Sequence, residues 1–180
     1  VSRGLGDVYK RQISNDALRC ALDNAMGMGL MNRALFRKSD LFSNIQEKFD
    51  LIVSNAVMQW VLDFDEVVLK MKNHLNDGGC FAFTTFGEKN YYEIKETTGL
   101  SLNYLKSETL RQKCEKYFDI LYLEEEIAGL YFDSPLDVLR HIKSSGTNGL
   151  KPLKWTFSKL KSFEKFYLEN CLLYTSDAAD

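Results

Sequence analysis

Residues 49–86 read FDLIVSNAVMQWVLDFDEVVLKMKNHLNDGGCFAFTTF, and this stretch decides the fold of the chain. It opens with FDLIVSN, an apolar run that ends on polar Ser54 and Asn55, as a buried strand does. It closes with a second buried strand, CFAFTTF, at residues 80–86. Strand, helix, glycine turn and strand is the pattern of a parallel crossover, which is expected to be right-handed. Such units bind ligands at the carboxyl ends of their strands.

The segment between the two strands has the pattern of an amphipathic helix. Asp63 and Asp65 mark an acidic start, and an apolar stripe at helical spacing then extends to Leu75. The helix is expected to close at the sequence NDGG, residues 76–79, because glycine readily ends helices.

Helix and strand signals continue to alternate on both sides of this stretch. Toward the amino end, cap-type residues at 14–16 precede a helix that stops at Gly27, and RALFRKSD at 33–40 is a short strand candidate. Toward the carboxyl end, the expected elements are a helix at 91–96, a helix capped by Ser107 that reaches Tyr117, a long strand or hairpin at 119–132, a helix from Ser134-Pro135 to Ser144, and a helix at 158–168.

Composition excludes several classes of function. A formal net charge of −2 over 180 residues gives no electrostatic footprint for nucleic acid. No apolar run approaches the roughly 18 residues of a membrane span. Cys20, Cys80 and Cys114 are scattered without disulfide or metal-ligand spacing. We therefore expect a cytoplasmic protein that binds neither a metal nor a membrane.

The two ends of the chain differ in character from its middle. DVYKRQ at residues 7–12 and CLLYTS at residues 171–176 can be encoded by the two strands of one DNA sequence, the inverted transposon-end adapter used to build sequencing libraries. We therefore expect residues 1–12 and 171–180 to be adapter-like scars that pack poorly, and residues 13–170 to be a partial domain.

Residues 49–94 resemble the fourth strand, following helix and fifth strand of class I S-adenosylmethionine-dependent methyltransferases. Three further stretches narrow the resemblance to the malonyl-carrier-protein O-methyltransferases of biotin synthesis: TGLSLNYL, LYFDSPLDVLRHIKSSGTNGL and KWTFSKLKSFEKFY. The resemblance implies an α/β fold, a truncated Rossmann-like sheet with flanking helices that lacks the first two strands and the last strand. The strands that remain are then expected to show a gap or an improvised pairing, and the isolated chain to be marginally stable or insoluble.

The resemblance also implies which residues form the cofactor site. S-adenosyl-L-methionine is the implied cofactor, and the implied wall is Ser39, Asp40, Leu41, Ser54, Asn55 and Ala56. The family's glycine-rich loop and its ribose-binding acid are absent; the acid would stand where Gln12 is. This chain is therefore expected to bind the cofactor weakly.

The implied substrate is malonyl-acyl carrier protein or malonyl-CoA, methylated on its free carboxylate. The candidate substrate-binding residues are Gln59, Trp60, Arg140, His141, Lys143 and Asn148. Arginine offers a bidentate fork to a carboxylate. No catalytic side chain is expected, because a carboxylate is already ionised at pH 7 and needs no general base.

Other interpretations stay open. Asn55 and Gln59 could merely close a turn, and a basic cluster near a helix end commonly complements the helix dipole. The alternative functions are a methyltransferase of the same fold for another small acid or a quinone precursor, and an incomplete fragment without catalysis.

Overall fold

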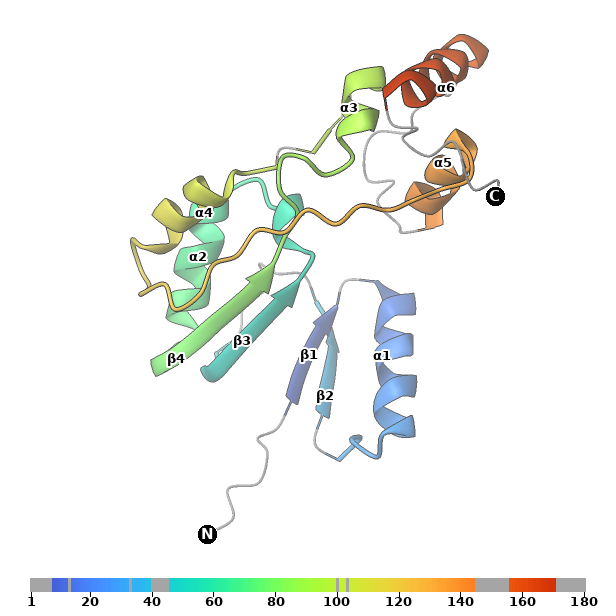
Figure 1. Cartoon of the computed structure of the whole chain (residues 1–180). Coiled ribbons are helices and arrows are strands. Elements are labelled where there is room, and N and C mark those ends of the chain that lie inside the picture. Colours follow the sequence, from blue (N-terminus) through green and yellow to red (C-terminus); the bar gives the residue numbers. More distant parts are fainter. Residues whose placement is uncertain are drawn as a thin grey trace, which may run out of the picture. The chain divides into compact units, whose positions relative to one another are not determined.

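The computed structural model describes residues 8–12, 14–32, 34–39, 46–99, 101–102, 104–144 and 156–170. The chain forms two compact units, Val1–Glu47 and Lys48–Asp180. In each unit two parallel strands are joined by a helix (Figure 1). The expected α/β class is confirmed.

The first unit contains β1 (Val8–Gln12), α1 (Asn15–Gly27) and β2 (Ala34–Lys38). The side chain of Ser14 caps α1 by accepting a backbone hydrogen bond from its first turn, as the sequence predicts. The strands pair in parallel from Val8 opposite Ala34 to Gln12 opposite Lys38. Residues 8–12 were expected to lie outside the fold, yet they give β2 its neighbour. The adapter origin of both ends stays a prediction, and residues 1–7 and 171–180 lie outside the described residues.

The second unit is built on β3 (Phe49–Asn55), α2 (Phe64–Asn73) and β4 (Leu75–Thr84). The expected parallel pairing of the two strands is confirmed. The end of the helix was predicted wrongly: Leu75 is the first residue of β4, where it pairs with Phe49. Residues 76–79 stand opposite the single residue Asp50 and form an irregularity in the strand, because the pairing resumes only at Leu51 opposite Cys80. Gly78, with φ +75°, supplies the backbone conformation this requires.

The two faces of the β3–β4 sheet are covered unequally. Ile52, Phe81, Ser54 and Phe83 share the face toward α2, and all four are half-buried. The ring of Phe83 lies 5.7 Å from that of Phe64 on α2. The residues of the opposite face are all exposed: Leu51, Val53, Asn55, Cys80, Ala82 and Thr84.

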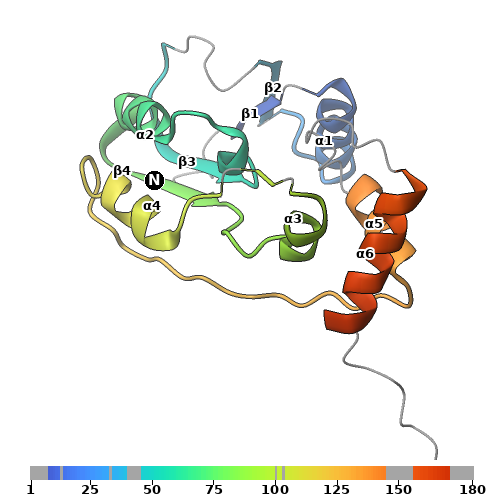
Figure 2. The same cartoon turned by 90° about the horizontal axis from the view of Figure 1, so that it is seen from above.

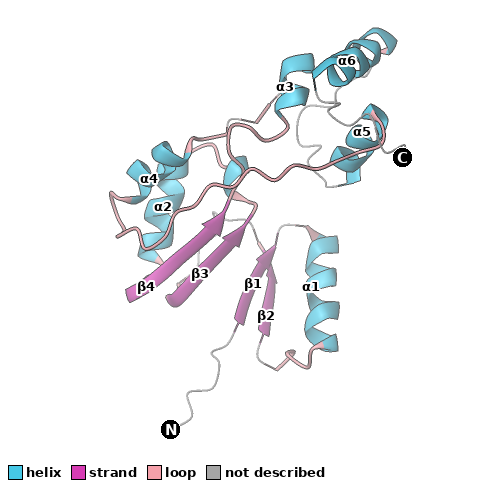
Figure 3. Cartoon of the chain, in the orientation of Figure 1, coloured by secondary structure: helices cyan, strands magenta, loops and turns pink. Residues whose placement is uncertain are grey.

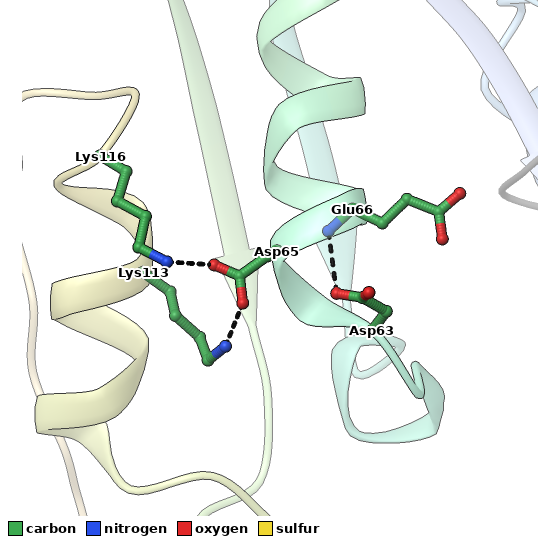
Figure 4. Close-up of polar contacts among 5 residues, drawn as sticks. All are labelled: Asp63, Asp65, Glu66, Lys113 and Lys116. Atoms are coloured by element: carbon green, nitrogen blue, oxygen red, sulfur yellow. Dashed lines mark hydrogen bonds and ion pairs between the residues drawn. The ribbon is translucent and has the colours of Figure 1, made fainter.

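Helix α4 (Ser107–Cys114) packs beside α2 and is tied to it by charge. Lys113 and Lys116 both donate to the carboxylate of Asp65, at 2.7 Å for Lys116 (Figure 4). These hydrogen bonds hold the pKa of Asp65 below its ordinary value.

Ser107 is not the cap residue that was expected. The helix begins one residue earlier than a serine cap allows, so the hydroxyl of Ser107 is free to donate to Glu125 at 2.8 Å.

The predicted strand or hairpin at residues 119–132 is wrong. This segment has no regular secondary structure and runs as a loop from α4 to the next helix (Figure 3). Leu121, Ile127 and Tyr131 are exposed along it. A strand needs a neighbour for its backbone N–H and C=O groups, and among the described residues β4 pairs only with β3.

The remaining helices form a small cluster of their own within the second unit (Figure 2). They are α3 (Tyr92–Thr98), α5 (Pro135–Ser144) and α6 (Phe157–Asn170), close to the predicted bounds. Ile94, Val138 and Phe163, one from each helix, make the buried core of this cluster.

Candidate functional site

The loop that leaves β3 is held in an unusual backbone conformation. Ala56 has φ +51°, in the left-handed region that residues with a side chain rarely adopt. Its N–H donates both to the carbonyl and to the hydroxyl of Thr84, each at 3.1 Å. Its carbonyl accepts from the side chain of Gln59 at 2.7 Å. A conformation of this kind persists only where the surroundings hold it, and here β4 and the turn Met58–Trp60 (η1) do so.

The ends of the two strands are also joined through their side chains. The hydroxyl of Thr84 donates to the amide oxygen of Asn55. Within the described residues, the amide nitrogen of Asn55 makes no hydrogen bond, and the residue is exposed. The carboxyl end of the sheet therefore presents a free N–H₂ donor.

The predicted substrate residues of this loop divide into two kinds. Both polar atoms of the Gln59 amide are already hydrogen-bonded. Its oxygen accepts from the hydroxyl of Thr85 at 3.4 Å, and its nitrogen donates to the carbonyl of Ala56. This geometry favours the alternative that Gln59 closes a turn. Trp60, by contrast, keeps 40% of its surface exposed.

The predicted cofactor residues lie in both units. Ser54 is half-buried on the face toward α2, whereas Asn55 lies on the open face. Ser39 directly follows β2 in the first unit and is half-buried. Asp40 and Leu41 lie outside the described residues.

Helix α5 carries the predicted basic cluster. Arg140 is exposed over 75% of its side chain and pairs with Asp137 at 2.6 Å. The hydroxyl of Ser134 and then Arg140 hold the pKa of Asp137 below its ordinary value. His141 is half-buried, with its ring 5.3 Å from that of Phe132. The side chain of Lys143 and all of Asn148 lie outside what the structure describes.

A broad open depression of the second unit connects the loop after β3 with α5. Ala56, Gln59 and Trp60 line one part of it, and Val138 and His141 line another. Arg140 does not line it. Among the members of the basic cluster whose side chains the structure describes, His141 lines this depression.

The hydrogen-bond donor at the end of β3, the amide of Asn55, fits one wall of a site for the implied cofactor. S-adenosylmethionine is rich in hydrogen-bond acceptors, and the free amide of Asn55 offers it a donor at the carboxyl end of β3. The described part of the first unit contributes no glycine loop, and β1 ends on Gln12 rather than on an acid. The fit is therefore confined to the wall at β3.

Sequence reasoning missed Thr84 and Thr85. The signal was present, because the expected strand CFAFTTF carries these two hydroxyl residues near its carboxyl end. Among the residues that the structure describes, no group of three or more His, Cys, Asp or Glu side chains could hold a metal ion. No helix in that part of the chain is long and apolar enough to cross a membrane.

Comparison with known proteins shows the family to which the chain belongs. The family described as "Methyltransferase domain" matches residues 6–152. The malonyl-[acyl-carrier protein] O-methyltransferase of Calditerrivibrio nitroreducens is 39% identical over 136 residues, 73% of this chain and 56% of that protein. Those of Chlorobium luteolum and Bacteroides thetaiotaomicron are 37% and 43% identical over 123 and 104 residues, covering 68% and 58% of this chain and 47% and 40% of theirs. The chain spans about half the length of the curated relatives it matches.

Proposed function

The chain belongs to the methyltransferase domain family, and from this premise we propose that the whole protein methylates the free carboxylate of a malonyl thioester with S-adenosyl-L-methionine at the start of biotin synthesis. The observation that carries the proposal is the similarity to malonyl-[acyl-carrier protein] O-methyltransferases over 73% of the chain. Malonyl-acyl carrier protein is the proposed substrate, with malonyl-CoA as the alternative thioester.

The proposed methyl transfer requires no catalytic side chain. S-adenosylmethionine supplies an electrophilic methyl group on a sulfonium. A malonyl carboxylate is ionised at pH 7, so it can attack without losing a proton. In-line placement and removal of water then supply the rate, and no acid, base or metal is required.

The residues at the end of β3 have the placing role in this proposal. Asn55 donates from its free amide to the cofactor, and the left-handed Ala56 turns the backbone that follows it. Gln59 fixes that backbone through its bond to the carbonyl of Ala56. Ser54, and Ser39, Asp40 and Leu41 of the first unit, are proposed as cofactor residues on the family resemblance alone.

The substrate carboxylate needs a binding site that is positively charged or rich in hydrogen-bond donors. His141 and Trp60 line the depression. Arg140 can reach a carboxylate only by exchanging Asp137 for it, since Asp137 holds its guanidinium at 2.6 Å. We place Arg140, His141, Lys143 and Asn148 in this substrate role together with Trp60.

The test is methyl transfer by the full-length protein that contains this chain. Methyl-labelled S-adenosylmethionine is incubated with malonyl-acyl carrier protein, malonyl-CoA, free malonate and a quinone precursor, and products are identified by mass. The expected product is the malonyl thioester methyl ester. Labelling of the quinone precursor or of free malonate alone would favour the alternative function, and no labelling of any substrate would refute the proposal.

Arg140→Ala gives a finer test of this substrate-binding site. We expect a higher KM for the malonyl thioester with unchanged cofactor affinity, a loss of about 2 kcal/mol for a charged hydrogen bond. Glu164→Gln, on the neighbouring helix α6, is the control. Unchanged kinetics would mean that Arg140 takes no part in substrate binding.

A further inference from the structure

The hydroxyl of Thr84 makes two hydrogen bonds of opposite sense. It accepts from the N–H of Ala56 at 3.1 Å, and it donates its single proton to the amide oxygen of Asn55. If the amide of Asn55 were reversed, the hydroxyl would accept twice. Its proton would then lack an acceptor among the described residues. In the structure the oxygen of the amide faces Thr84 on β4, and the N–H₂ group is left for another acceptor.

We propose that Thr84 is a positioning residue that fixes the amide of Asn55 as a hydrogen-bond donor to the cofactor. The inference rests on the proposed function, since it takes S-adenosylmethionine as the ligand. Thr84 need not touch that ligand. It acts through Asn55, and it also secures the left-handed Ala56 from which the loop turns away.

Three variants of the full-length protein separate orientation from mere support. Thr84→Val keeps the shape of the side chain and removes both of its hydrogen bonds. Thr84→Ser keeps the hydroxyl and is the matched control. Asn55→Asp keeps an acceptor for Thr84 and replaces the outward donor by an acceptor.

The measurements are the dissociation constant for S-adenosylmethionine by calorimetry and the thermal unfolding midpoint. We expect Thr84→Val and Asn55→Asp each to weaken binding roughly tenfold, the loss typical of one hydrogen bond. Thr84→Ser should bind like the wild type. The double variant should bind no more weakly than the weaker single variant, because both changes remove the same donor.

A Thr84→Val variant that binds like the wild type would overturn the inference, as would losses that multiply in the double variant. Should Thr84→Val fail to fold, Thr84→Ala, which also lacks the hydroxyl, takes its place: weaker binding at an unchanged midpoint supports the inference, and unchanged binding refutes it. A wild type that binds S-adenosylmethionine but leaves malonyl thioesters unmethylated contradicts only the proposed substrate. A wild type that does not bind the cofactor refutes both.

Discussion

The two faces of the β3–β4 sheet have similar sequences and different surroundings. Ile52, Phe81 and Phe83 pack toward α2, whose Val67 and Val68 are fully buried. On the opposite face, Leu51 and Val53 are as apolar but remain 57% and 67% exposed. Near-continuous apolar strands are typical of parallel sheets that are covered on both faces. Within the second unit, the described residues cover only one face of this sheet.

This difference separates what stabilises the unit from what it offers to ligands. The packed face contributes the apolar burial, whereas the open face ends at Asn55 and Thr84, where the candidate site lies. Substitutions on the two faces should therefore have different consequences, and the following changes test the contrast from the largest expected effect to the smallest.

Val68→Asp should abolish cooperative unfolding of the second unit. An unpaired charge in a fully buried position costs several kcal/mol, of the order of the whole stability of a small domain. Urea denaturation followed by circular dichroism measures this. Leu69→Asp, one position along α2 and 41% exposed, is the control and should cost far less. Equal effects of the two would contradict the packing of α2 on one face.

Phe83→Ala should lower the free energy of unfolding by about 3 kcal/mol, near the lower end for loss of a large aromatic side chain because Phe83 is only half-buried. The ring also loses its contact with Phe81, 5.0 Å away. Ala82→Ser, on the open face, should change stability by less than about 0.5 kcal/mol. A reversed order would mean that the faces have been assigned the wrong way round.

Leu51→Lys combined with Val53→Lys should leave the stability of this chain nearly unchanged and raise its solubility. Both positions are exposed, and contiguous apolar surface favours association. Size-exclusion chromatography across concentrations measures association. Strong destabilisation by these lysines would show that another part of the chain covers the open face.

The smallest expected effect is a pH dependence at Asp65. Hydrogen bonds from Lys113 and Lys116 lower the pKa of Asp65 below its ordinary 3.8. The ion pairs therefore stabilise the folded unit above that value, and this contribution is lost as the pH falls through the lowered pKa. Asp65→Asn should remove this acid dependence when urea midpoints at neutral and acid pH are compared. Glu66→Gln should retain it.

Sequence patterns predicted those features that depend on nearby residues. The cap Ser14 and the bound at Gly27 predicted α1, and the apolar runs predicted β2, β3 and the core of β4, whereas the helix end expected at residues 76–79 was wrong. The prediction of a strand at residues 119–132 was wrong because strand formation depends on a neighbouring strand edge, which local sequence does not reveal. The apolar content of the segment is nevertheless that of a strand.

The sequence by itself determined the α/β class, the parallel crossover at residues 49–84 and the family resemblance, because these follow from short-range periodicity and motif spacing. Only the tertiary structure decided which face of the sheet is covered, and that the amide of Asn55 turns its oxygen to Thr84. Asn55 and Thr84 are 29 positions apart, and a hydrogen bond between them exists only once the strands are in register.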